Sequence, residues 1–69
     1  MPQYESIDEI VLDCLNRTRP IDAQEFILRY ERLCKKIKVM PLIGQAETAL
    51  RRLKSEGKIV AKDGKCRKI

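Results

Sequence analysis

Residues 46–69 read AETALRRLKSEGKIVAKDGKCRKI, and this stretch carries the clearest structural pattern in the chain. Its apolar residues recur at helical spacing as far as Gly57, a residue type that commonly ends a helix in the left-handed region. Two short strand-like runs follow, separated by Asp63 and Gly64, a pair typical of a type I′ turn. The stretch therefore predicts an amphipathic helix that leads directly into a β-hairpin.

The two-residue turn predicts the register of this hairpin, which we expect over about residues 58–69. Lys62 should lie opposite Lys65, and Ile59 opposite Lys68. Successive side chains of a strand point to opposite faces. One face of the hairpin should therefore carry Ile59, Ala61 and Cys66, and the other Val60 with Lys58, Lys62, Lys65 and Arg67.

Three helices are expected, over about residues 6–17, 22–37 and 42–56. Ser6 and Asp22 each stand three residues before a glutamate, which is the pattern of a capping box at a helix start. Apolar residues at i, i+3, i+4 and i+7 within each segment predict one buried face per helix.

The helix boundaries follow from particular residues. Pro20 should end the first helix, because the residue before a proline is disfavoured in the α region. Ile21 and Phe26 stand at the two positions of a hydrophobic staple around the start of the second helix. The third helix has two possible starts, with Pro41 in its first turn or near Gly44, since no strong N-cap residue stands at either place.

The chain has 69 residues, enough for one domain. A chain of this length buries only about 60% of the surface that its unfolded form exposes, so its core is small. We therefore expect a single domain over residues 1–69, of the α+β class and mostly helical. Such a domain has no room for an enclosed substrate pocket.

Charge is distributed unevenly along the sequence. The net charge is +5 overall, but residues 1–28 carry −4 and residues 29–69 carry +9. Such asymmetry points to nucleic acid or an anionic membrane as a partner. The alternative is a lysine-rich surface that is simply well solvated.

Motifs of catalysis are missing from the sequence. It contains no histidine, hence no hydrolase triad, and it lacks the glycine-rich phosphate-binding patterns. Cys14, Cys34 and Cys66 are widely spaced, whereas zinc sites use closer pairs, so Cys14 and Cys34 are interpreted as small core residues. We expect a protein that is not an enzyme and takes no cofactor, metal or small-molecule ligand.

A membrane partner is not expected either. No apolar run reaches the roughly 18 residues of a membrane span. The first residues do not have the pattern of a signal peptide, and an odd number of cysteines suits a reducing compartment. The expected location is the cytoplasm.

Cationic and polar side chains make the third helix and the hairpin the candidate site. Like charges on one hairpin face are unfavourable, and a phosphate backbone would neutralise them; the alternative is that these lysines block edge-to-edge aggregation. Arginine, glutamine and threonine on a helix can read base edges, although such a face is also an ordinary solvated one. The candidate DNA-binding residues are Gln45, Thr48, Arg51, Arg52, Lys58, Lys62, Lys65, Arg67 and Lys68.

The stretch QAETALRRLKSEGKI, residues 45–59, resembles the recognition helix and first wing strand of the winged helix-turn-helix superfamily of DNA-binding domains. Elsewhere the likeness is one of element order. The resemblance implies a three-helix winged helix with a C-terminal two-stranded wing. It also implies that the third helix enters the major groove of double-stranded DNA while the wing reaches the backbone or the minor groove.

A small transcriptional regulator, or an accessory factor of phage or plasmid type, fits this resemblance. The second helix is long for the superfamily, and the third lacks the tyrosine and asparagine that Z-form binders use, so that class is rejected. Tight specific binding by so small a domain would need a homodimer or a second protein. The alternative function is a protein-interaction winged helix that meets an acidic partner, with Leu12 and Leu28 as its exposed apolar candidates.

Overall fold

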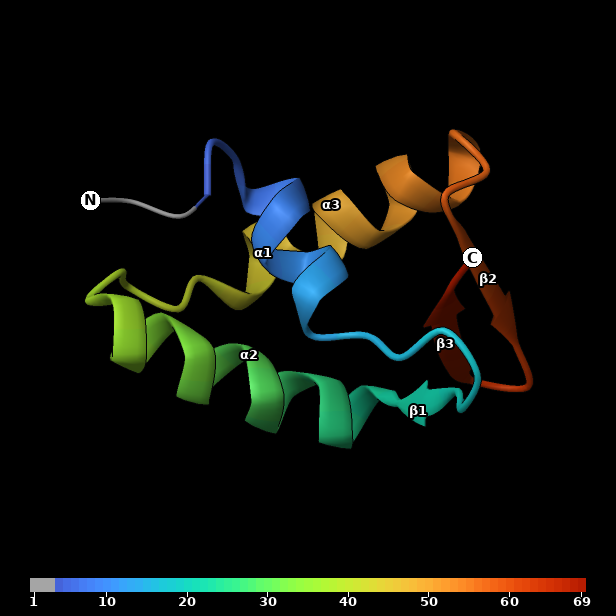
Figure 1. Cartoon of the computed structure of the whole chain (residues 1–69), viewed down its shortest axis with the longest axis horizontal. Helices are drawn as coiled ribbons and strands as arrows, with labels where there is room; N and C mark the ends of the chain where they lie inside the picture. Colours follow the sequence, from blue (N-terminus) through green and yellow to red (C-terminus); the bar gives the residue numbers. More distant parts are fainter. Residues whose placement is uncertain (1–3) are drawn as a thin grey trace.

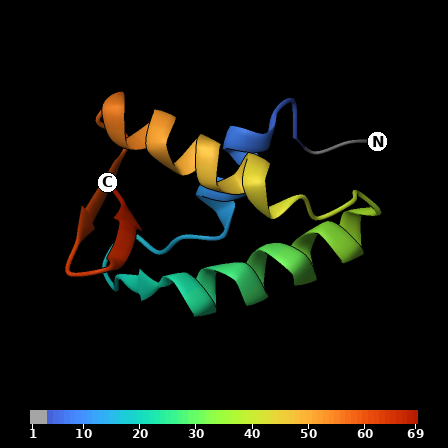
Figure 2. The ribbon, with the colours of Figure 1, turned by 180° about the vertical axis from the view of Figure 1, so that it is seen from behind.

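The computed structural model describes residues 4–69, which form three helices and three strands (Figure 1). In chain order these are α1 (Ile7–Asp13), β1 (Ile21–Asp22), α2 (Ala23–Ile37), α3 (Ile43–Ser55), β2 (Ile59–Lys62) and β3 (Lys65–Lys68). Helix α3 crosses α1, α2 runs below them, and the sheet closes one end of the molecule (Figures 1 and 2). The expected α+β class is confirmed.

The hairpin has the predicted register. Lys62 pairs with Lys65 and Ile59 with Lys68. Asp63 and Gly64 both have positive φ, at 55° and 73°, as a type I′ turn requires. The register places Ile59 and Cys66 on the core side of the hairpin, where Ile59 is buried and Cys66 half-buried.

A third strand joins the hairpin, although only two strands were predicted. Ile21 pairs with Cys66 and Asp22 with Lys65, so the sheet order is β1-β3-β2 and all pairs are antiparallel. A strand of two residues is too short to show an alternation of apolar and polar side chains. It is identified only by its pairing with β3, in which Cys66 lies 45 residues after Ile21. Ile21 is also buried against the core, as the hydrophobic staple with Phe26 requires.

Helix α1 is shorter than predicted: it ends at Asp13 and not near residue 17. Leu15 remains buried, which explains why the apolar periodicity continued past the helix end. Asn16 bonds to distant parts of the chain. Its carbonyl accepts a hydrogen bond from the Lys68 N–H (2.9 Å), and its Oδ1 accepts one from Arg29 (3.1 Å). Tertiary partners therefore unwind the last predicted turn.

The two predicted capping boxes differ. Asp22 accepts the Glu25 backbone N–H at 2.7 Å, which confirms the first half of the capping box predicted for α2. The Glu25 carboxylate pairs with Arg19 and Arg29. Ser6 occupies the N-cap of α1 but its side chain makes no capping bond, so that half of the prediction is wrong. Glu9 instead accepts the N–H of Glu5, at 2.9 Å.

Replacing Asp22 with alanine is therefore expected to cost about 1 kcal/mol of unfolding free energy, because an orphan N–H of α2 loses its acceptor. Ser6→Ala is the matched control and should change stability by less than about 0.5 kcal/mol. Urea unfolding followed by circular dichroism measures both. Equal effects of the two substitutions would contradict the assignment of the caps.

Both ends of α3 were indicated by the sequence, whereas the residue that ends α2 was not. Helix α3 starts at Ile43, between the two considered starts, so Pro41 precedes the helix. Gly57 ends the turn after α3 with a φ of 74°, as predicted. Lys38 closes α2 in the left-handed region, at a φ of 61°, without the glycine that would mark this position in a sequence.

One apolar core joins all the elements. Ala46 and Ala49 are fully buried where α3 crosses α1, since their small side chains permit close approach. Tyr30 is buried and stacks on Phe26, with ring centroids 5.9 Å apart. The buried set is Ile10, Val11, Cys14, Leu15, Ile21, Phe26, Tyr30, Cys34, Ala46, Ala49, Leu53 and Ile59. Within residues 4–69, no helix is both long and apolar enough to cross a membrane.

Candidate nucleic-acid interface

An open groove lies between α3 and the hairpin. Gly57 has a φ of 74°, and the Lys58 N–H donates to the Leu53 carbonyl (2.9 Å), which turns the chain from α3 into β2. The groove has a volume of about 610 Å³. Its walls are Glu47, Leu50, Arg51 and Lys54 from α3, and Ile59, Ala61, Lys62, Asp63, Gly64, Lys65 and Cys66 from the hairpin.

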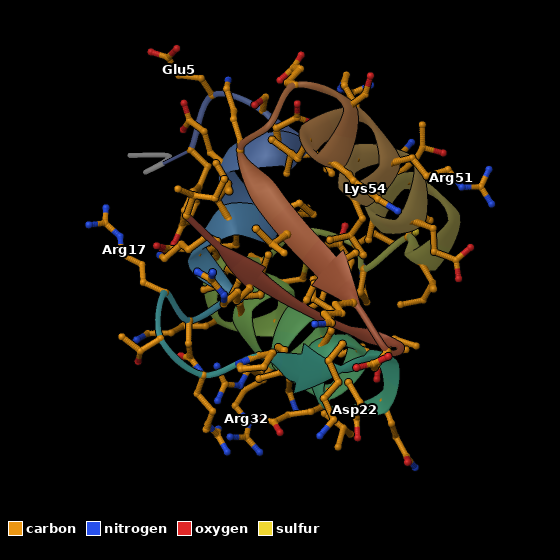
Figure 3. The ribbon with its side chains drawn as sticks, turned by 90° about the vertical axis from the view of Figure 1, so that its right-hand side faces the viewer. Glu5, Arg17, Asp22, Arg32, Arg51 and Lys54 are labelled. Atoms are coloured by element: carbon orange, nitrogen blue, oxygen red, sulfur yellow. The ribbon has the colours of Figure 1, made fainter. Side chains whose placement is uncertain are left out.

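Four cations line this groove: Arg51, Lys54, Lys62 and Lys65. Within residues 4–69 none of the four forms an ion pair. Figure 3 shows Arg51 and Lys54 projecting from the same side of α3, with Lys54 nearer the hairpin. Glu47 and Asp63 are the acidic residues of the wall, so the lining retains a net positive charge.

The predicted reading face of α3 is divided between two edges of the helix. Arg51 faces the hairpin groove, whereas Gln45, Thr48 and Arg52 line a smaller hollow of about 290 Å³ beside Ile7 of α1. The Thr48 hydroxyl donates to the Gly44 carbonyl at 3.0 Å. The structure therefore does not gather the four predicted α3 residues into one cluster.

Arg52 is held by a carboxylate of α1. Its Nε donates to Asp8 Oδ2 at 3.0 Å, and its Nη2 contacts the other oxygen of the same carboxylate. This two-pronged contact lowers the pKa of the Asp8 carboxyl below its ordinary value, through hydrogen bonding first and charge attraction second. The pair ties α1 to α3 beside the smaller hollow.

Asp8→Asn is expected to lower the unfolding free energy at pH 7. A carboxyl whose pKa is depressed in the folded state stabilises the fold above its unfolded-state pKa, and this contribution disappears as pH falls through the folded pKa. The difference between the parent and the variant should therefore shrink below about pH 4. Urea unfolding at several pH values measures it, and a difference that is constant with pH would contradict the ion pair.

The remaining predicted residues of the hairpin have intramolecular partners. Arg67 donates to the Arg17 carbonyl at 3.1 Å, so its guanidinium leans toward the loop after α1 and away from α3. The Lys58 ammonium lies 3.4 Å from Glu56. Lys68 is half-buried, and its backbone N–H is bonded to Asn16. Lys62 and Lys65, at the turn, are the hairpin cations that border the groove.

Lys54 and Glu47 were not among the predicted site residues, yet both line the groove. Their spacing with Leu50 and Arg51 is i, i+3, i+4, i+7, which places all four on one helix edge. Periodicity alone does not predict that this edge of α3 lies next to the hairpin.

Cysteines occupy two kinds of environment. Cys14 and Cys34 are buried in the core, as predicted, and burial raises the pKa of the Cys14 thiol to about 11. Cys66 is half-buried in the wall of the groove, and burial raises its pKa as well. Among residues 4–69, no cluster of three or more His, Cys, Asp or Glu side chains is placed to hold a metal ion.

Comparisons of the chain with protein-family models, with curated proteins and with solved structures found no match.

Proposed function

We propose that this chain is a winged-helix domain that binds double-stranded DNA, with α3 in the major groove and the hairpin against the backbone. The observation that carries the proposal is the set of four cations, Arg51, Lys54, Lys62 and Lys65, along one open groove. Each phosphate that such a side chain neutralises releases counterions, which favours binding. The element order and the sheet order β1-β3-β2 are compatible with a winged helix.

The dimensions of α3 suit this role. Its 13 residues give a length of about 20 Å. A helix with its side chains is about 10–12 Å wide, close to the width of the major groove. In that position the two edges of α3 would face opposite strands of the duplex. Arg51 and Lys54 would approach one strand, and Gln45, Thr48 and Arg52 the other.

Arg52 would act differently from the other cations, because Asp8 holds it in the free protein. Its contact with DNA would require exchange of the carboxylate for a phosphate or a guanine edge. Lys62 and Lys65 would meet the backbone from the turn of the hairpin. The biological role that fits is a small cytoplasmic transcriptional regulator or an accessory factor of phage or plasmid type.

An HSQC titration of the labelled protein with a mixed-sequence duplex at two salt concentrations tests the proposal. The expected result is a set of shifts confined to residues 44–55 and 58–68 that weakens at the higher salt concentration. Absence of shifts at low salt would overturn the proposal. Shifts centred on α2 would reject this binding face.

Cys66 offers a second test, because its thiol lies in the groove wall. Bound duplex is expected to slow alkylation of Cys66 by N-ethylmaleimide at least about tenfold, because only about one site in ten is free once occupancy reaches about 90%. Cys14 and Cys34 are buried and serve as internal controls, since they should react only on unfolding. Unchanged Cys66 labelling in the saturated complex would place the duplex elsewhere.

The second candidate function, binding to an acidic protein, draws on one observation. Leu28 is 58% exposed on the outer side of α2, whereas Leu12 is half-buried and packs against the core. A partner captured in a pull-down that depends on Leu28, and not on Lys62 and Lys65, would favour this function over DNA binding.

A further inference from the structure

The connection between α2 and α3 exposes three large apolar side chains. Val39, Met40 and Leu42 are 40%, 72% and 43% exposed. Single exposed apolar residues are ordinary, but adjacent ones form a patch that usually marks an interaction surface. Residues 38–42 lie at the end of the molecule opposite the sheet (Figures 1 and 2). We call them the tip.

Lysines lie within and beside the tip. Lys35 and Lys36 are exposed in the last turn of α2, and Lys38 caps that helix. In the part of the chain that the structure describes, these three ammonium groups form no ion pair. The tip therefore presents an apolar centre with a cationic border, and it lies away from the groove between α3 and the hairpin.

The outer side of α1 carries an acidic hollow. Tyr4, Glu9, Leu12 and Asp13 line an open hollow of about 370 Å³, with exposed Glu5 nearby in the chain. The Tyr4 ring and Leu12 pack partly against the core and supply apolar surface. Across residues 4–69, the carboxylates of Glu5, Glu9 and Asp13 form no ion pair, and Asp13 accepts a hydrogen bond from the Tyr4 hydroxyl.

We propose that the tip of one copy of this chain docks into the α1 hollow of a second copy. Three cations around an apolar centre would then face three carboxylates around an apolar hollow, which matches both charge and polarity. The two surfaces are different parts of the same molecule, so the contact is head-to-tail and joins copies into an open chain or a ring.

This contact is small. Stable complexes bury about 1,200–2,000 Å² in total, and a five-residue tip falls below that range. We therefore expect a dissociation constant on the order of 0.1–1 mM. The inference does not rest on nucleic-acid binding, and it is tested without DNA.

Charge exchange between the two surfaces gives the sharpest test. The variant Lys36→Glu/Lys38→Glu makes both surfaces of a copy acidic, and Glu5→Lys/Glu9→Lys makes both basic. Each variant alone should repel itself and sediment as a monomer, whereas an equimolar mixture should associate, because every tip then meets a hollow of opposite charge. Sedimentation equilibrium from about 0.05 to about 2 mM spans the expected dissociation constant.

Two further variants complete the design. Arg17→Glu/Arg19→Glu changes the net charge by the same amount as the tip variant, at two exposed positions in the loop between α1 and β1, and should associate like the parent. Met40→Ser should weaken association at least about fivefold through lost apolar contact, while Leu28→Ser should not. A parent chain that stays monomeric at the highest concentration, or a mixture that fails to associate, would overturn the proposal.

Discussion

Replacing Arg51 and Lys65 together with alanine is expected to reduce the affinity for a mixed-sequence duplex about 60-fold at about 0.1 M salt. The two side chains stand on opposite walls of the groove, one on α3 and one on the hairpin. Each phosphate contact changes the logarithm of the affinity by about 0.9 per tenfold change in salt. Lowering the salt from about 1 M to about 0.1 M therefore raises the affinity about eightfold for each phosphate contact, and a variant that lacks the contact lacks this gain.

Fluorescence anisotropy across a salt series measures this effect. The salt dependence of the double variant should be shallower than that of the parent by about 1.8 in slope. The matched control is Arg17→Ala/Arg32→Ala, which removes the same net charge from the part of the molecule that Figure 3 shows away from Arg51 and Lys54. If both double variants lose affinity equally, the protein binds through its overall charge and the groove has no special role.

Leu53→Ala is expected to have the largest effect on stability, a loss of about 2–5 kcal/mol. Leu53 is fully buried on the core face of α3, and its carbonyl accepts the Lys58 N–H that turns the chain into β2. A domain of this size has a total unfolding free energy of about 3–10 kcal/mol. The substitution is therefore expected to leave a measurable unfolded fraction in water at 25 °C.

Urea unfolding gives the comparison, with Leu28→Ala as the control. The chemical change is the same, but Leu28 is exposed on α2, so its loss should matter by less than about 0.5 kcal/mol. Similar midpoints for the two variants would show that α3 does not pack on the core as described here.

The hairpin was predictable in detail because its determinants are local. Asp63 and Gly64 adopt the positive φ values of the turn, and the turn fixes every pair of β2 and β3. The end of α1 and the strand β1 were not predictable in this way. Both depend on contacts with Lys68 and Cys66, which lie about 50 residues further along the chain.

The candidate site shows the same division. Residue types and periodicity identified Arg51, Lys62 and Lys65, which the structure places along one groove, but they missed Lys54. They also treated Arg52 as equivalent to Arg51. Arg52 lies on the other edge of α3, where Asp8 neutralises it from 44 residues away, and charge counting along a sequence does not detect such a partner.

The order of the strands has a consequence for how the domain forms during synthesis. Strand β3 is the centre of the sheet, yet it is the last of the six elements to leave the ribosome. Until it emerges, β1 and β2 have no sheet partner, and Ile21 and Ile59 lack their cross-strand partners Cys66 and Lys68. Within residues 4–69, however, every buried core residue precedes β3, the last of them being Ile59. The helices can therefore pack while the chain is still being made, and closure of the sheet is the last step of folding.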